Sequence, residues 1–197
     1  MPAVGELLAD RYRIESFIRQ GTVGPVYLCH DVVMDRDVAV VVLAAALATE
    51  DPELWQRTRR RMRLEARAAG RLTHQNLVTA YSFDSDAVGN LCLVLGHGSE
   101  PTLAERLKAG PLAAGQALDI TLDVARAIQA LDNQGIVHRD IKPDHILIDA
   151  QGTARVTGLG LAQLREDILG AQDDVGRPGT PAYMSPEQAT SSAALDQ

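Results

Sequence analysis

Residues 137–149 read VHRDIKPDHILID, and ionisable side chains crowd the first part of this stretch. A histidine, an arginine, two aspartates and a lysine fall within positions 137–144, directly before an apolar, strand-like run. Such side chains can accept protons and stabilise charge, so their density indicates a catalytic loop. His145 does not match the chemistry that its neighbours suggest. The stretch therefore either still works or keeps only the shape of a working site.

The elements that must position this loop follow from the hydrophobic pattern of the chain. The first half predicts strands, one helix and then two more strands. Asp51 is a good N-cap for that helix, and Pro52 suits its first turn. The strands are expected at 12–18, 26–29, 38–43, 77–83 and 91–95, and the helix from 51 to about 71.

The second half of the chain predicts helices rather than a sheet. A short helix is expected at 103–108 and a longer one at 113–134, which ends near Gly135. The longer helix carries apolar side chains on one face, at Leu118, Leu122, Ala125 and Ile128. A small hairpin is expected to pair 146–148 with 154–157.

Composition limits the classes of protein. The chain has 197 residues, is 46% hydrophobic and carries a net charge of −7, which argues against a general nucleic-acid-binding surface. Its lysines are Lys108 and Lys142, and its other cations are arginines. Cys29 and Cys92 lack metal-ligand spacing and are interpreted as buried thiols in a reducing compartment. Because no signal peptide or apolar run of about 20 residues is found, we expect a cytoplasmic protein without a membrane segment.

Two long motifs, IVHRDIKP and GTPAYMSPEQ, resemble those of bacterial serine/threonine protein kinases of the eukaryotic (Hanks) type. The resemblance runs from about residue 10 to residue 197. It implies an α+β fold with two lobes: a small antiparallel-sheet N-lobe with one helix at 10–96, and a mainly helical C-lobe at 97–197. The C-lobe is expected to be incomplete, ending before the family's central helix.

The resemblance also implies which residues meet ATP in the N-lobe. Gly21 and Gly24 match two glycines of the phosphate loop, and Arg19 replaces the first glycine. The family's strand lysine is absent, because Val41 follows Val38, Ala39 and Val40. Arg19 is a candidate substitute for it. The remaining cofactor-binding positions are Val26, Ala39, Leu95 at the gatekeeper position, His97 in the linker, and the helix glutamate Glu65.

In the C-lobe, the resemblance assigns a general base to Asp140 and a phosphoryl contact to Lys142. Two positions that hold Mg²⁺ in the family are changed: His145 stands for an asparagine and Gly158 for an aspartate. Mg²⁺ prefers oxygen ligands, so we expect no magnesium site and weak ATP binding at most. A zinc or manganese site using His145 stays open as an alternative.

Segment 161–179 contains no Ser, Thr or Tyr, although active relatives are often phosphorylated there. We hypothesise that Asp173 or Asp174 pairs with Arg139 in place of a phosphate; an acidic loop in solvent is the alternative. The arginine-rich helix near residue 60 is either a solvated face or a docking site for an acidic partner.

Three functions are compatible with this pattern. The first is a pseudokinase that acts as a protein-binding or regulatory module. The second is an atypical ATP-dependent kinase of low activity that uses Asp140 and Lys142. The third is a truncated product without a stable function.

Overall fold

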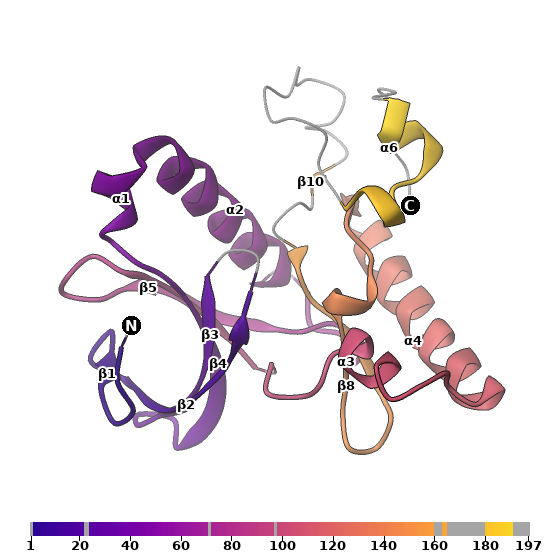
Figure 1. The fold of residues 1–197 in the computed structure, drawn as a ribbon, viewed down its shortest axis with the longest axis horizontal. Helices are drawn as coiled ribbons and strands as arrows, with labels where there is room; N and C mark the ends of the chain where they lie inside the picture. The colour runs from indigo at the N-terminus through magenta and orange to yellow at the C-terminus, as the bar shows by residue number, and fades with distance from the viewer. Residues whose placement is uncertain are drawn as a thin grey trace. The chain divides into compact units, whose positions relative to one another are not determined.

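The structure is a computed structural model that describes residues 2–21, 24–70, 72–96, 98–159, 163–164 and 180–190. The chain forms two compact units (Figure 1). The first comprises Met1–Gly70 with Val78–Ser99, and the second comprises Arg71–Leu77 with Glu100–Gln197. The division expected between residues 96 and 97 stays a prediction.

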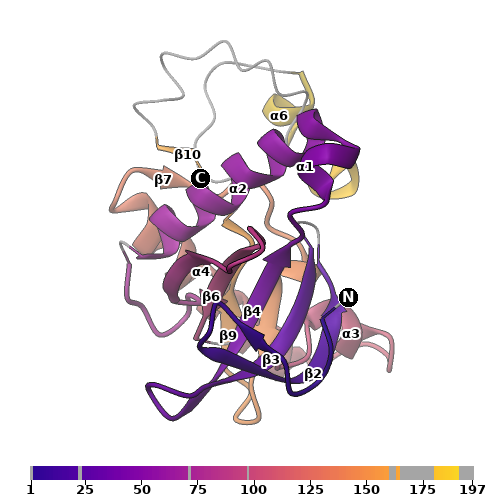
Figure 2. The ribbon, with the colours of Figure 1, turned by 90° about the vertical axis from the view of Figure 1, so that its left-hand side faces the viewer.

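An antiparallel sheet dominates the first unit, in the order β1-β2-β3-β4-β6-β5. Figure 2 shows β2, β3 and β4 side by side. The strands are β1 (Leu7–Leu8), β2 (Tyr12–Gln20), β3 (Pro25–Asp31), β4 (Arg36–Leu43), β5 (Ala80–Ser85) and β6 (Leu91–Leu95).

The two faces of this sheet carry different sets of apolar side chains because side chains alternate along a strand. One face builds the core of the unit, with Val38, Val40 and Val42 of β4 at its centre. Both cysteines lie in this core, where burial raises the pKa of each thiol to about 12. The buried free thiols expected from the sequence are therefore confirmed.

Helix α2 (Pro52–Gly70) packs against β5 and β6. The predicted N-cap is confirmed, because the Asp51 carboxylate accepts a hydrogen bond from the backbone N–H of Leu54 at 2.9 Å. Thr58 and Met62 lie buried on one side of the helix. A one-turn helix, α1 (Leu47–Glu50), precedes α2 and is not predicted from the sequence.

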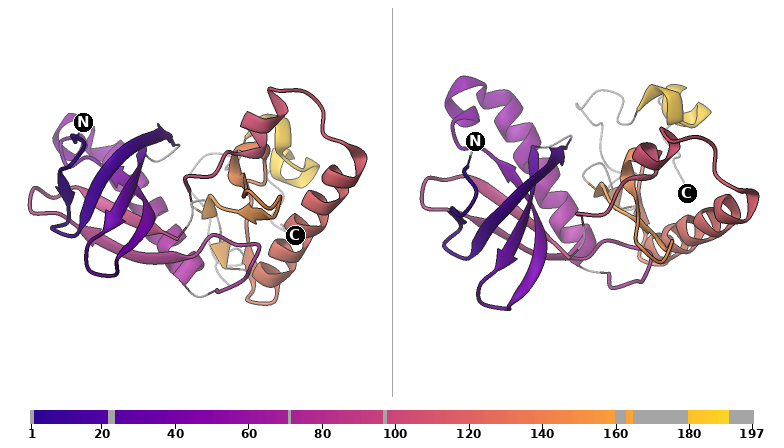
Figure 3. Two further views of the ribbon diagram at one scale, coloured as in Figure 1. Left: turned by 90° about the horizontal axis from the view of Figure 1, so that it is seen from below. Right: turned by 60° about the horizontal axis from the view of Figure 1, so that its bottom comes forward.

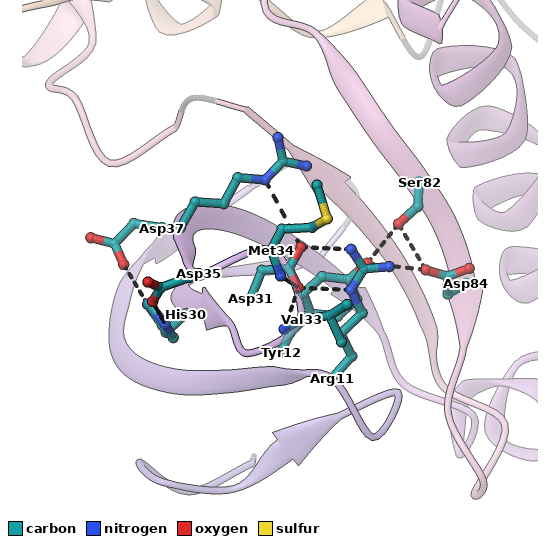
Figure 4. A network of polar contacts seen from close by, with 11 residues as sticks. Arg11, Tyr12, His30, Asp31, Val33, Met34, Asp35, Asp37, Ser82 and Asp84 are labelled. Carbon is teal, nitrogen blue, oxygen red and sulfur yellow. Dashed lines mark hydrogen bonds and ion pairs between the residues drawn. The ribbon is translucent and has the colours of Figure 1, made fainter.

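A polar network ties the turn after β3 to the segment before β2 (Figure 4). The Asp31 carboxylate is buried and accepts two hydrogen bonds from the Arg11 guanidinium, at 2.7 and 2.8 Å. This pairing holds the pKa of Asp31 below its ordinary value. The same carboxylate accepts bonds from the backbone N–H groups of Val33 and Met34, so it also shapes the β3–β4 turn.

The second unit combines helices with short strand pairs. Figure 3 shows α4 as its longest element. Its elements are α3 (Leu103–Leu107), α4 (Ala114–Asp132), β7 (Ile136–Val137), η1 (Pro143–His145), β8 (Ile146–Ile148), β9 (Ala154–Val156), β10 (Gln163–Leu164), η3 (Pro181–Tyr183) and α6 (Pro186–Thr190). Strand β8 pairs with β9, and β7 pairs with β10.

Packing in this unit positions the loop between β7 and η1. Helix α4 buries Ile120, Ala127 and Leu131, and it packs against β7 and β9. The buried Asn76 side chain donates a hydrogen bond to the Ala154 carbonyl at 3.0 Å and so fixes segment 72–77 to β9. The loop at 138–142 therefore leaves a short strand that α4 supports and enters a hairpin that α4 also supports.

The predicted α+β class is confirmed. The strand predicted at 77–83 is displaced: β5 begins at Ala80, and Leu77 instead pairs with Val156 in the second unit. The apolar side chains of Leu118 and Leu122 on α4 are exposed. Among the described residues, no helix is both long enough and apolar enough to cross a membrane.

Candidate functional site

The loop after β7 is anchored by a buried histidine. His138 Nδ1 lies 3.3 Å from the backbone N–H of Asp140, which donates to it. The ring proton therefore sits on Nε2, which donates to the Thr157 carbonyl at 3.0 Å. Because the ring is fully buried, the pKa of His138 falls to about 4. A neutral His138 thus joins the loop to the end of β9.

The carboxylate of Asp140 is engaged on both oxygens. Its Oδ1 accepts from the backbone N–H of Thr180 at 3.1 Å and from the Thr180 hydroxyl at 3.0 Å. Its Oδ2 lies 3.3 Å from Lys142 Nζ. The Lys142 ammonium also donates to the Thr180 hydroxyl at 2.8 Å. These three residues form a closed cluster, called the Asp140 cluster below, that holds the segment beginning at Thr180.

A second contact holds the same segment to the loop. The Gln188 amide in α6 donates to the Arg139 carbonyl at 2.8 Å. Arg139 itself has a positive φ of 70°, which side-chain-bearing residues adopt rarely. The hypothesised partners Asp173 and Asp174 lie outside the described residues.

His145 turns its ring back onto the loop. Its Nδ1 donates to the Asp140 carbonyl at 2.8 Å and lies 3.4 Å from Asp140 Oδ2. Burial lowers the pKa of His145, so the ring is neutral at neutral pH. Its orientation is fixed from its own backbone as well, because Thr157 N–H donates to the His145 carbonyl at 3.0 Å.

The ring of His145 fills the space that a side chain at position 158 would need. A β-carbon placed on Gly158 would lie 2.7 Å from the Cγ and Nδ1 atoms of that ring. Gly158 also has a φ of +81°, a conformation that favours glycine. The two departures from the kinase pattern are therefore in contact: the residue that gained a ring packs against the residue that lost a carboxylate.

These residues do not fit a magnesium ion. The position of one family ligand offers an imidazole whose Nδ1 is already hydrogen-bonded, and the other offers a bare α-carbon. Magnesium takes oxygen ligands in octahedral order. Within the described ranges, no group of three or more His, Cys, Asp or Glu side chains is placed to hold a metal. The alternative of a zinc or manganese site on His145 lacks such a group of three in those ranges, and it stays a prediction.

In the first unit, the strand register places three expected nucleotide contacts on one face of the sheet. Ala39 lies opposite Leu95, and Val26 lies opposite Val41, two positions along β4 from Ala39. Because alternate residues share a face, the side chains of Val26, Ala39 and Leu95 lie on the same side. All three are buried within the described structure.

The position expected for the strand lysine belongs to the same apolar face. Val41 lies between Val26 on β3 and Leu93 on β6 and is half-buried. Arg19 lies opposite Val26 in β2, and its proposed role as a substitute cation stays a prediction. The side chain of Glu65 and all of His97 lie outside the described residues.

The structure gives Gly21 and Gly24, the two glycines of the expected phosphate loop, roles that do not depend on a nucleotide. The Gly21 N–H donates to the Gly24 carbonyl at 2.9 Å, which closes the turn between β2 and β3. A β-carbon on Gly24 would collide with the Val42 carbonyl oxygen of β4. Sheet packing alone therefore requires glycine at position 24.

A second pair of complementary positions lies after β6, and the sequence did not reveal it. A β-carbon on Gly96 would lie 2.6 Å from the Tyr81 hydroxyl oxygen. The Arg36 guanidinium stacks over the Tyr81 ring at 3.6 Å from its centroid. The ring of Tyr81 thus occupies the space beside Gly96, where the kinase pattern has an acidic side chain.

Thr180 and Gln188 are the site residues that the sequence only partly identified. Thr180 was recognised from the GTPAY motif, whereas its bonds to Asp140 and Lys142 were not predicted. Gln188 gave no signal beyond its place in SPEQ, although it donates to the Arg139 carbonyl. The Thr180–Asp140 contact joins residues 40 positions apart and the Gln188–Arg139 contact joins residues 49 apart, ranges at which periodicity carries no information.

Comparison with known proteins extends the match beyond the motifs. Residues 12–196 match the family model described as protein kinase domain. The chain is 34% identical over 186 residues to serine/threonine-protein kinase PknB of Mycobacterium leprae, an alignment covering 92% of this chain and 29% of that protein. It is 35% identical over 189 residues to serine/threonine-protein kinase PrkC of Bacillus subtilis, covering 94% and 28%.

A shorter relative gives the same result. Serine/threonine-protein kinase PknA of Mycobacterium tuberculosis is 32% identical over 194 residues, covering 95% of this chain and 43% of that protein. The chain thus spans less than half the length of each of these three relatives.

Proposed function

This chain belongs to the protein kinase family, and from that premise we propose that it is a kinase-like domain impaired in phosphate transfer, which acts by binding a protein partner. Nucleotide binding is weak or lost, and magnesium is not required. The retained residues Asp140, Lys142 and Arg139 then serve chiefly to hold the fold of the second unit.

The observation that carries this proposal is the contact between His145 and Gly158. The β-carbon of any side chain at position 158 would lie 2.7 Å from the imidazole ring of His145. A single substitution at position 158 therefore cannot restore a carboxylate without moving the half-buried His145 ring. The side chain at position 145 packs against the backbone at position 158, and neither side chain offers an oxygen ligand. This contact supports a site that does not hold a metal ion.

The missing lysine supports the same proposal from the first unit. Phosphate transfer in this family depends mostly on positioning and on electrostatic stabilisation by the strand lysine and the metal ligands. Loss of one preorganised electrostatic group commonly lowers the rate by about 10²–10³. Three such groups are replaced here, by Val41, His145 and Gly158. Such losses do not simply multiply, yet each removes part of the grip on the triphosphate.

The second candidate is a slow, atypical serine/threonine kinase. The Asp140 cluster favours it, because the carboxylate, Lys142 and Thr180 remain within hydrogen-bonding range of one another. A base held in this way could still accept a proton if a nucleotide were bound by other contacts.

One assay separates the two candidates. Phosphate transfer from labelled ATP to the chain itself and to casein is measured with Mg²⁺, with Mn²⁺ and with EDTA. The proposal expects no transfer above that of Asp140→Asn in any condition, and a thermal shift with ATP that is small and independent of Mg²⁺. Transfer that requires Mg²⁺ or Mn²⁺ and disappears in Asp140→Asn would establish the slow kinase instead.

Restoration gives a positive test of the same idea. The triple variant Val41→Lys, His145→Asn, Gly158→Asp is compared with Val41→Lys alone and with the His145→Asn, Gly158→Asp pair. We expect a magnesium-dependent thermal shift with ATP in the triple variant and in the pair, but not in the single variant. An equal magnesium-dependent shift in the unmodified chain would refute the loss of magnesium binding.

A further inference from the structure

Helix α2 carries a row of arginines along its exposed side. Arg57, Arg60, Arg63 and Arg67 are all exposed and follow one another at intervals of three, three and four residues. At these spacings, side chains lie above one another on one face of a helix. We call these four residues the arginine row.

The buried side chains on the opposite side of α2 explain why the arginine row faces outward. Thr58 and Met62 are buried, and α2 packs against β5 and β6. The arginine row therefore faces away from the sheet of its own unit. Among the described residues, no side-chain hydrogen bond or ion pair involves a guanidinium of the arginine row.

The arginine row costs the helix stability. Like charges three or four residues apart repel each other and weaken a helix. A solvated helix face needs charge for solubility, but mixed signs provide it with less repulsion. The row moreover sits in a chain whose net charge is −7, so its positive charge is local. These facts point to a negatively charged ligand.

We propose that the arginine row binds a protein segment rich in aspartate and glutamate. This inference rests on the proposed binding function and names its partner class. Arg57 and Arg67 are ten residues apart, so the row is about 15 Å long. An extended segment of about five residues spans that length. The planar guanidinium fork can bind a carboxylate through two hydrogen bonds, which a lysine cannot do.

Charge distribution favours a short acidic segment over nucleic acid or a lipid surface. Charge is screened over about 8 Å at physiological salt, so a short peptide on α2 meets mainly the arginines. A long polyanion or an anionic membrane would also meet the acidic remainder of the chain, which repels both. Bases need aromatic side chains for stacking, and the nearest on α2, Trp55, is half-buried.

The test measures binding of a fluorescein-labelled glutamate peptide of about ten residues to the full chain by fluorescence anisotropy. A glutamine peptide of equal length is the neutral probe. The variant is Arg57→Gln, Arg60→Gln, Arg63→Gln. The matched control removes three exposed cations elsewhere, Arg13→Gln, Lys108→Gln, Arg126→Gln, and so changes the net charge equally. Circular dichroism checks that helix content is unchanged.

We expect the α2 variant to bind the glutamate peptide about tenfold more weakly, since each exposed pair contributes modestly. The control variant should bind it within about twofold of the unmodified chain. The glutamine peptide should not bind. Arg→Lys at the same three positions should give an intermediate affinity, because charge is kept and the fork is lost. Equal weakening in both triple variants would overturn the proposal.

Three further outcomes would also overturn it. A single-stranded oligonucleotide, or vesicles of phosphatidylserine, could bind more tightly than the peptide and lose binding in the α2 variant. Sedimentation could instead show a dimer that the α2 variant dissociates, in which case the partner is a second copy of this chain. None of these measurements involves phosphate transfer, so the binding result and the result of the kinase assay can fail independently.

Discussion

The loop at 138–142 of the second unit and the sheet of the first differ from the kinase pattern in different ways. In the second unit, Asp140, Lys142 and Thr180 remain and bond to one another. In the first unit, the lysine position is Val41, which simply continues an apolar face of the sheet. One region has kept polar side chains, and the other has replaced its charge with a hydrocarbon.

The difference follows from what each side chain holds besides a ligand. Asp140 accepts two hydrogen bonds from Thr180, so its loss would release a segment of the chain. A lysine at position 41 would have no comparable task without a nucleotide, because its neighbours Val26 and Leu93 are apolar. Retention of Asp140 is thus explained by structure and is not by itself a sign of catalysis.

The largest expected effect comes from disturbing the contact between His145 and Gly158. Gly158→Asp alone should lower the free energy of unfolding by about 4 kcal/mol, because the new side chain meets the half-buried His145 ring and the aspartate must adopt a positive φ. Urea unfolding measures the change. His145→Asn combined with Gly158→Asp should recover more than half of it. No recovery in the double variant would mean that ring contact is not the cause.

The second effect depends on pH. The pKa of His138 is about 4 in the folded chain, whereas an unperturbed histidine, as in the unfolded chain, has a pKa of 6.5. Between these pH values the unfolded chain binds the proton more readily than the folded chain does. The contribution of a neutral, buried His138 to the free energy of unfolding is complete above pH 6.5. It falls by about 3 kcal/mol as the pH is lowered towards 4. Urea unfolding from pH 7 to pH 4 should show a flatter dependence for His138→Asn. Equal slopes in both proteins would contradict the assignment.

The third effect tests whether Asp140 is structural. Asp140→Ala leaves the Thr180 N–H without its acceptor and removes the carboxylate paired with the Lys142 ammonium, which should cost about 2 kcal/mol. Asp119→Ala removes an exposed carboxylate from α4 and should cost less than about 0.5 kcal/mol. Limited proteolysis should also cut the Asp140 variant faster near Thr180. Similar stability of the two variants would remove the structural explanation for retaining Asp140.

The smallest effect is expected in the sheet. Val41→Lys should cost about 1 kcal/mol, because a long side chain at a half-buried position can place its ammonium in solvent. Val33→Lys, in the exposed β3–β4 turn, is the control and should be neutral within about 0.5 kcal/mol. If Val41→Lys lowered the free energy of unfolding as much as Gly158→Asp does, the two units would tolerate the family's side chains equally poorly.

Much of the fold was predictable because its signals are local. Runs rich in apolar, β-branched and aromatic residues indicated the strands near residues 12, 26, 38 and 91, and the Asp51–Pro52 pair indicated the start of α2. Strands β1, β7 and β10 are two residues long, too short for any periodicity. Helix α1 is a single turn directly before a good N-cap, so the sequence did not separate it from the turn.

The candidate site was predictable by residue type but not by contact. The motifs identified Asp140, Lys142, His145 and Gly158 one by one. They did not show that the His145 ring fills the space beside Gly158, or that Tyr81 does the same beside Gly96. In each case a glycine replaces a side chain of the family and an aromatic ring comes from elsewhere. A glycine at a position that usually bears a carboxylate is the signal that could have prompted a search for such a ring.

The Arg11–Asp31 pair bears on how the domain should be trimmed for expression. The family match begins at Tyr12, yet Leu8 is 1% exposed and Arg11 donates two of the hydrogen bonds that the buried Asp31 carboxylate accepts. The Gly5 N–H also donates to the Ile14 carbonyl. A recombinant boundary drawn at the start of the family match would remove the Arg11 guanidinium from the buried Asp31 carboxylate and expose part of the core of the first unit. The practical start of this domain therefore lies upstream of Gly5.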